Sequence, residues 1–356
     1  DEVLDEAITQ CRAAGRFEDW VQKTVPALAE TADEITAKVL IESAPYPIDG
    51  VQGDEPEPIP LRWIFYTRDV AAMTPGGLVL SRFINQDRIP EPALVRLALD
   101  WSPTLGRCPV AFDALKAKVN VQGGDIVVVD DKTLFLGVGS LTDIAAAPKL
   151  ARALKMDVVT VQLPPDSSAK KWYGLRKLFL HLDTTFGLLD TKMAVTVPYA
   201  FESKFAERHS LEQMTRACRK LPGGESIEFR KTMRILRDVG RVRRFVAGSG
   251  EPDPRVVGMK LVDYLRSVGY RLVFVGGEPP PAVDAEFFRS RLLPELRAQA
   301  ANVVALGPGR VIAYAENSHT LRALGAAGID VQTFPGSALA RWHGGPHCLT
   351  LPLERG

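Results

Sequence analysis

The sequence predicts an α/β protein: a small propeller of ββαβ modules with a helical segment at its N-terminus. Short runs rich in β-branched and aromatic residues alternate with helical runs along most of the chain. Tight turns join two pairs of these strands, within Val127–Leu134 and within Ala305–Val311. In each case a helix and then another strand follow. The recurrence of this order, without close repetition of side chains, indicates a quasi-repeat architecture.

The first part of the chain is expected to be helical. Apolar side chains recur at three- and four-residue steps from Glu2 to about Ser43. A segment rich in proline, glycine and acidic residues follows between Pro45 and Pro60, and it is the best candidate for a linker. We therefore divide the chain into a helical segment, residues 1–50, and an α/β domain, residues 51–356. Because Asp1 already lies within a helical pattern, we expect the natural N-terminus to lie upstream.

The remaining elements follow from the same two periodicities. Strands are expected at Trp63–Tyr66, Leu78–Leu80, Ile126–Val129, Thr133–Val138, Val158–Leu163, Leu178–Leu182, Met193–Val197, Leu272–Val275, Val303–Leu306, Arg310–Ala313 and Val331–Phe334. Helices are expected at Pro92–Asp100, Thr142–Leu154, Phe201–Ala217, Arg255–Ser267 and Ser318–Ala327. Gly328 is a suitable C-terminal cap for the last of these helices.

Composition excludes several classes of protein. The chain has 356 residues, of which 46% are hydrophobic and 24% charged, as in ordinary globular proteins. A net charge of +1 argues against nucleic acid as a partner. No apolar run approaches the ~20 residues that span a bilayer, and no signal peptide is recognisable. Four scattered cysteines without metal-binding spacing favour a reduced, cytoplasmic setting.

A cysteine near the C-terminus is the first candidate for chemistry. Cys348 follows the sequence Gly344-Gly345-Pro346-His347. Two glycines allow positive φ angles and a close approach to another surface, and Pro346 fixes the next φ. Such a turn can present a nucleophilic thiol. The alternative is a small buried hydrophobic residue, which is the commoner role of cysteine.

Three further windows carry polar residues. On the strand expected near residue 181, His181 and Asp183 would share one face, as a proton shuttle beside an anionic group. The alternative is a buried, hydrogen-bonded pair. Asp69 follows an expected aromatic strand and could be a second anionic group or a turn residue. Gln122-Gly123-Gly124-Asp125, taken alone, indicates only a turn.

Taken together, these residue types suit attack on a planar cationic carbon. Two carboxylates can bind a guanidinium group through paired, charge-assisted hydrogen bonds. The bound cation also favours the thiolate form of a nearby cysteine, whose ordinary pKa is about 8.5.

In this combination the chain resembles the arginine deiminase branch of the guanidino-group-modifying superfamily, the penteins. The matching motifs are Thr67-Arg68-Asp69, Gln122-Gly123-Gly124-Asp125, His181-Leu182-Asp183-Thr184 and Gly344-Gly345-Pro346-His347-Cys348. They stand in the order of the family, from about Pro60 to the end of the chain. The resemblance implies a five-module propeller with a central channel. Residues 1–50 resemble the helical insertion of that branch, whereas its first αβ module is not found.

The resemblance also implies roles. Cys348 would be the nucleophile and His181 the general acid and base, while Asp69 and Asp183 would hold the guanidinium. Attack by Cys348 would release ammonia and leave a thiouronium adduct, which water would convert into a ureido product. The substrate would be a small guanidino compound, and no metal or organic cofactor is needed. The sequence leaves a homo-oligomer open.

Several positions depart from the family pattern. Gln122 stands where the family usually has glutamate, and an amide carries no charge. Trp63 and His343 stand where relatives carry an asparagine and an arginine that recognise the amino-acid end of arginine. With Arg68 of the Thr-Arg-Asp motif, these residues are expected to bind the substrate, which would be arginine or an arginine derivative. Arg88 remains as a candidate partner for a substrate carboxylate.

Two alternatives stay open at this point. The order His347-Cys348-Leu349-Thr350 is also similar to that of the amidinotransferases, which pass the amidino group to an amine. A non-catalytic pentein that binds a ligand is the other alternative. Gln122 and the altered positions favour it, whereas Cys348 and His181 argue against it.

Overall fold

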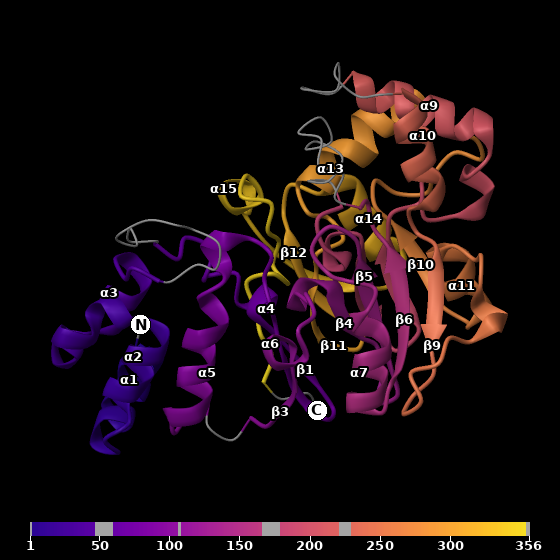
Figure 1. Cartoon of the computed structure of the whole chain (residues 1–356). Helices are drawn as coiled ribbons and strands as arrows, with labels where there is room; N and C mark the ends of the chain where they lie inside the picture. The colour runs from indigo at the N-terminus through magenta and orange to yellow at the C-terminus, as the bar shows by residue number, and fades with distance from the viewer. Residues whose placement is uncertain (1, 47–59, 106–107, 166–178, 221–228, 354–356) are drawn as a thin grey trace. The chain divides into compact units, whose positions relative to one another are not determined.

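The computed structural model describes residues 2–46, 60–105, 108–165, 179–220 and 229–353 (Figure 1). The chain divides into two compact units, which are described separately below. The first unit comprises residues 1–123 and 352–356, and the second comprises residues 124–351. The predicted linker lies mostly outside the described residues, as does the predicted boundary at residue 50.

The first unit begins with short helices: α1 (Glu2–Ala13), α2 (Phe17–Thr24), the 3-10 segment η1 (Pro26–Glu34) and α3 (Ala37–Glu42). The helical prediction for this region is therefore confirmed. Their apolar faces form one hydrophobic core that also includes Leu94 and Leu97 of helix α5 (Glu91–Trp101). The Asp5 carboxylate accepts a hydrogen bond from the Ala37 amide at 2.7 Å and so holds the start of α3.

One ββαβ module completes the first unit. Strands β1 (Ala71–Thr74) and β2 (Gly77–Leu80) are antiparallel, and β3 (Val110–Asp113) joins β2 in parallel after α5. The sequence did not predict β1 and β3, because each has four residues and little alternation. Short helices α4 (Thr67–Val70), η2 (Gln86–Arg88) and α6 (Ala114–Ala117) flank the strands.

The strand expected at Trp63–Tyr66 is wrong. The backbone there makes tight turns, in which Ile64 N–H donates to Leu61 O at 3.3 Å and Tyr66 N–H donates to Trp63 O at 2.9 Å. The rings of Trp63 and Tyr66 stack with centroids 6.2 Å apart. Aromatic residues, which generally favour strands, therefore lie in turns here. Thr67, Arg68 and Asp69 consequently lie on helix α4 and do not follow a strand.

The described residues of the second unit form three more modules of the same topology. They are β4 (Ile126–Val128), β5 (Thr133–Val138), α7 (Ala146–Leu154) and β6 (Asp157–Gln162); β7 (Phe186–Asp190), β8 (Met193–Thr196), α11 (Leu261–Ser267) and β10 (Arg271–Phe274); and β11 (Val304–Gly307), β12 (Arg310–Tyr314), α14 (Ser318–Ala326) and β13 (Asp330–Phe334). Each pairs an antiparallel hairpin with a parallel third strand. The predicted α/β class and ββαβ repeat are thus confirmed, and Gly328 follows α14 with φ 85°.

Other elements connect these modules. They are η3 (Gly123–Asp125), η5 (Leu182–Thr184), η6 (Ser203–Phe205), α9 (Arg208–Arg219), α10 (Phe229–Asp238), β9 (Val242–Phe245), η8 (Pro254–Val256), α12 (Ala285–Phe287), η9 (Phe288–Leu292), α13 (Leu293–Arg297) and α15 (Ser337–Ala340). The helices expected to start at Phe201 and Arg255 begin later than predicted. The second starts only at Leu261, because Gly258 has φ 93° and interrupts the helical backbone.

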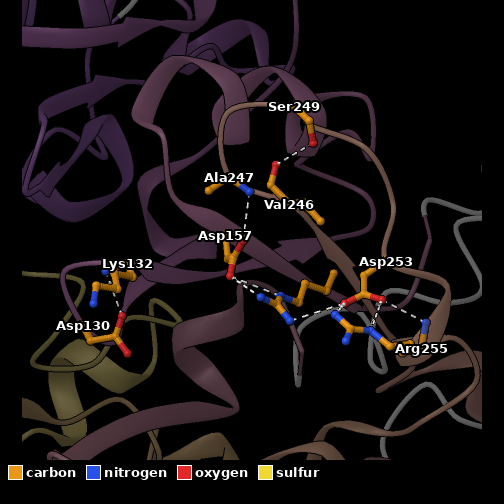
Figure 2. Close-up of polar contacts among 9 residues, drawn as sticks. Asp130, Lys132, Asp157, Val246, Ala247, Ser249, Asp253 and Arg255 are labelled. Atoms are coloured by element: carbon orange, nitrogen blue, oxygen red, sulfur yellow. Dashed lines mark hydrogen bonds and ion pairs between the residues drawn. The ribbon is translucent and has the colours of Figure 1, made fainter.

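Strand β9 adds to the edge of the β4-β5-β6 sheet, antiparallel to β6. Charged side chains tie this edge together, and Figure 2 shows Asp157, Asp253 and Arg255 in the cluster. The Arg244 guanidinium donates to Asp157 at 2.5 Å and to Asp253 at 3.3 Å. Hydrogen bonds from Arg255 lower the pKa of Asp253 to about 2. The Asp253 carboxylate therefore stays ionised and keeps both arginines in place at neutral pH.

Among the residues that the structure describes, every helix is too short or too polar to cross a bilayer.

Candidate active site

The C-terminal turn that carries Cys348 is held by groups on neighbouring elements of the second unit. The Tyr314 hydroxyl at the end of β12 donates to Gly344 O at 3.1 Å. The Glu316 carboxylate accepts the amides of Gly336 at 3.0 Å and Ser337 at 2.8 Å, where α15 begins. Burial raises the pKa of Tyr314, so its hydroxyl stays protonated and remains a donor. Cys348 is 3% exposed.

The glycine pair serves a close approach. A Cβ atom added to Gly345 would lie 2.5 Å from Asn302 Cβ and 2.6 Å from Asn302 Cγ, well inside contact distance. Any side chain at this position would displace Asn302 or the turn. The close approach expected from the sequence is confirmed at Gly345. Within this turn, His343 has a left-handed backbone with a φ angle of 67°.

Asn302 binds the turn through its whole amide group. Its Oδ1 accepts the backbone amides of His347 at 2.9 Å and Cys348 at 3.2 Å. Its Nδ2 donates to Asp183 O at 3.1 Å and to Cys348 Sγ at 3.2 Å. Because two backbone donors fix the position of the oxygen, the nitrogen must face the sulfur. Asn302 is buried and lies two residues before the start of β11.

His181 and Asp183 lie on a turn, so the expected strand there is wrong for the described residues 179–182. His181 precedes the 3-10 segment η5, and its carbonyl accepts Thr184 N at 3.2 Å and Thr184 Oγ1 at 2.7 Å. The local threonine hydroxyl competes with strand pairing for this carbonyl. The argument that both side chains share one strand face therefore does not apply. Leu178 lies outside the described residues.

Asp125 of the Gly-Gly-Asp motif binds this turn through its carboxylate. Its Oδ1 accepts the Leu182 amide at 3.0 Å, and its Oδ2 accepts Thr142 Oγ1 at 2.6 Å. A Cβ atom at Gly137 would overlap Asp125 Oδ1, so glycine is required at that point of β5. The motif thus positions Leu182, which lies between His181 and Asp183. The sequence alone indicates only a turn for this motif.

The Asp183 carboxylate contacts both the Cys348 thiol and the His347 imidazole. Its Oδ2 lies 3.5 Å from Cys348 Sγ and 3.0 Å from His347 Nδ1. Asp183 is 2% exposed, so the contacts are shielded from water. A carboxylate that accepts a hydrogen bond from a thiol favours the thiol over the thiolate. A cation bound at Asp183 would therefore promote ionisation of Cys348.

In the first unit, Asp69 lies in a buried cluster with Arg88 and Glu91. Arg88 Nη1 donates to Asp69 Oδ2 at 2.7 Å, while Arg88 Nε and Nη2 donate to Glu91 at 3.0 and 2.8 Å. The Arg88 guanidinium carbon also lies 4.4 Å from the centroid of the Phe83 ring. The Arg88 guanidinium is thus bound on several sides within its own unit, which removes the main argument for it as a partner of a substrate carboxylate.

The Glu91 cluster predicts a pH dependence of stability. Burial, opposed by the hydrogen bonds and charge of Arg88, raises the pKa of Glu91 to about 7. Between pH 4.5 and 7 the folded state then binds more protons at Glu91 than the unfolded state, so the free energy of unfolding falls as pH rises. Glu91→Gln should reduce this fall by about 2 kcal/mol between pH 5 and pH 8, measured by urea denaturation.

Asp100→Asn is the matched control, because Asp100 lies on the same helix in an exposed ion pair with Arg96. Its pH profile should follow that of the parent protein. Parallel profiles for Glu91→Gln and the parent would contradict the assignment.

The other predicted substrate-binding residues are distributed over both units. Gln122 and Arg68 are buried, and a Cβ atom at Gly123 would overlap the Arg68 carbonyl oxygen. The glycine therefore brings the Gln122 segment against α4. Trp63 Nε1 donates to Asp87 Oδ2 at 2.9 Å. His343 is half-buried in the Cys348 turn.

The structure therefore brings together two groups of predicted site residues. Cys348 contacts Asp183 in the second unit, and Asp69 lies on α4 beside Arg68 in the first. That both groups face one substrate stays a prediction. No cluster of three or more potential His, Cys, Asp or Glu metal ligands occurs within the described ranges.

Sequence reasoning missed Asn302 and the contact of His347 with Asp183. Asn302 stands in the run Ala300-Ala301-Asn302-Val303-Val304, where a polar residue interrupts a buried apolar segment. Such an interruption is the signal that could have identified it, because a buried amide needs hydrogen-bond partners.

Comparison with known proteins identifies the family of this chain. The model of the arginine deiminase family matches residues 54–355. The chain belongs to the arginine deiminase family. The arginine deiminase of Metamycoplasma hominis is 26% identical over 95% of this chain and 76% of its own length. That of Listeria monocytogenes serotype 4a is 27% identical over 83% of this chain. This family member spans 62% of the length of the Listeria relative.

Solved structures with similarity to this arginine deiminase family member include two further proteins. One is apo ArgZ, an arginine dihydrolase from the ornithine-ammonia cycle in cyanobacteria, with 16% identity and a TM-score of 0.47 over 82% of this chain and 32% of that chain. The other is DDAH from Pseudomonas aeruginosa in complex with citrulline, with 15% identity and a TM-score of 0.45 over 82% of this chain and 77% of that chain.

Proposed function

We propose that this chain hydrolyses a guanidino group of arginine or an arginine derivative, with Cys348 as nucleophile. The observation that carries the proposal is the buried contact of Cys348 Sγ with Asp183 Oδ2 at 3.5 Å. A thiol, a carboxylate and a hydrogen-bond donor converge there, as attack on a cationic carbon requires. Membership of the arginine deiminase family supports the same chemistry.

The proposed reaction begins when a guanidinium binds Asp183 and Asp69. Its positive charge neutralises Asp183, Cys348 passes its proton to His181, and the thiolate attacks the guanidinium carbon. His181 protonates the departing nitrogen, and ammonia leaves as the carbon–nitrogen bond breaks. A thiouronium adduct on Cys348 remains. His181 then deprotonates a water molecule, which attacks the same carbon and releases the ureido product with the thiolate.

The substrate class is inferred from the residues expected to bind the rest of the substrate. Gln122, Arg68, Trp63 and His343 are proposed to bind the substrate. Arg88 is bound to Asp69 and Glu91, and His343 replaces an arginine of the family pattern. Fewer cationic side chains are therefore available to bind an α-carboxylate. This supports an arginine derivative whose carboxylate is blocked or absent.

We further propose that the four observed ββαβ modules are blades of a propeller and that residues 1–50 are a helical insertion in its sequence. The shared topology of the four three-strand units supports the first proposal. The common core of α1–α3 with α5 shows how such an insertion can be anchored.

The test is a panel of guanidino compounds incubated with the purified chain. Arginine, Nα-acetylarginine, agmatine and an Nω-methylated arginine sample both ends of the molecule. We expect stoichiometric ureide and ammonia from at least one compound, detected by mass spectrometry and an ammonia assay. Addition of glycine as an amine acceptor distinguishes transfer, because a transferase forms amidino-glycine and the parent amine of the substrate in place of the ureide and ammonia. Absence of ureide from every compound would overturn the proposal.

A further inference from the structure

The Asn302 side chain contacts both the backbone and the sulfur of the Cys348 turn. Its Oδ1 takes two backbone amides, and its Nδ2 gives one hydrogen to Asp183 O and one to Cys348 Sγ. An amide has two donor hydrogens and two acceptor lone pairs, so its capacity is used in full. The direction of the Nδ2–H toward the sulfur is therefore fixed.

This donor opposes the effect of the neighbouring carboxylate. Asp183 Oδ2 at 3.5 Å favours the protonated thiol, because a negative charge disfavours a second one nearby. A hydrogen bond donated to sulfur is stronger when the sulfur is charged, so Nδ2 favours the thiolate. Both groups and the sulfur are buried, which strengthens these interactions relative to water.

We propose that Asn302 is a further catalytic residue, which stabilises the Cys348 thiolate by the hydrogen bond from Nδ2 while Oδ1 fixes the turn. The inference rests on the proposed function for its role in turnover, whereas its effect on the thiol is independent of any substrate. The Asn302 amide offers a neutral donor, so it stabilises the anion without binding the guanidinium in competition with Asp183.

Asn302→Asp tests this assignment. The carboxylate keeps an oxygen for the two backbone amides, but it replaces the donor with a negative charge beside the sulfur. We measure alkylation of Cys348 by iodoacetamide from pH 6 to pH 10, following the peptide by mass spectrometry. The midpoint should rise by about one pH unit, which is a tenfold lower rate below the midpoint. Because the new charge itself contributes to this rise, Asn302→Ala separates the two roles: a residue that only fixes the backbone would leave the profile of Asn302→Ala equal to that of the parent.

Three controls make the result specific. The peptide that carries the half-buried Cys108 is an internal reference in each digest. Asn317→Asp introduces the same change at another buried asparagine, whose Nδ2 donates to Ala298 O at 2.9 Å, and it should leave the Cys348 profile unchanged. Asn302→Ala removes the donor without adding charge, and it should shift the midpoint upward by less. If Asn302→Asp does not fold, an Asn302→Ala profile identical to that of the parent overturns the proposal.

The two proposals fail differently. If Asn302→Asp shifts the alkylation of Cys348 but the protein forms no ureide, the proposed hydrolysis is contradicted. The effect of Asn302 on the thiol then still stands. Ureide formation with alkylation profiles that coincide in parent and variant would support the hydrolysis and overturn the inference.

Discussion

Replacement of Cys348 with alanine is expected to reduce ureide formation at least ~10⁴-fold, because no other group in the proposed mechanism forms the covalent bond to carbon. The substitution removes one sulfur atom from a buried turn whose backbone is held by Asn302 and Tyr314. The fold should therefore persist. Initial rates with the best compound of the panel measure the loss, and near-ultraviolet circular dichroism checks the fold.

Substrate binding should survive this substitution. Asp183 loses a thiol neighbour but keeps His347, and the carboxylate stays available to a cation. Cys108→Ala is the matched control, since Cys108 is a half-buried cysteine of the first unit. It should retain the parent rate. Cys348→Ala at a tenth of the parent rate or more would show that Cys348 is not the nucleophile.

Gly345→Ala should cause the second largest loss, about 10² in kcat. The new methyl group would lie 2.5–2.6 Å from carbon atoms of Asn302, so the amide or the turn must move. A displacement of about 1 Å at a reacting group commonly costs 10²-fold in rate. Overpacking also costs about 1–3 kcal/mol of stability, which urea denaturation measures. Rate and stability are therefore determined for the same samples.

Gly325→Ala provides the matched control for this prediction. Gly325 lies in helix α14, and a Cβ atom there meets no heavy atom within 4 Å. The substitution should leave kcat unchanged and stabilise the helix by up to about 1 kcal/mol. The effects of Gly345→Ala and Asn302→Ala should not add when combined, because both act on one contact. Additive effects, or a parent-like kcat for Gly345→Ala, would contradict this account.

The hairpins β4-β5 and β11-β12 could be predicted from sequence because a tight turn joins the two strands of each. Thr133–Val138 was predicted residue for residue, since its length and β-branched content suffice. Strand β1, Ala-Ala-Met-Thr, carries no such signal, and its pairing with β2 decides its conformation. At Trp63–Tyr66 the error is the opposite one, because a strand was predicted where the structure has turns. Its aromatic residues favour a strand in isolation, whereas ring stacking and local turns determine the observed backbone.

The site was predictable as far as its motifs are local. Cys348 and Asp183 come together as the resemblance implies, although the expected strand at His181 is a turn. The contacts of Asn302 were beyond sequence reasoning, because they join residues 46 and 119 positions apart. The same holds for Arg88 on η2 and Asp69 on α4, which lie 19 positions apart in the sequence. Such long-range pairs have no periodicity to reveal them.

The contact between the Cys348 thiol and Asp183 has a consequence for the protein in the absence of ligand. Thiolates, and not thiols, react readily with peroxide and with electrophiles. In the proposed mechanism, the hydrogen bond to Asp183 favours the thiol and so protects the sulfur from oxidation until a cation binds. Arrival of a cationic ligand ends that protection at the moment when reactivity is needed. We expect an occupied protein to be inactivated by peroxide faster than an unoccupied one.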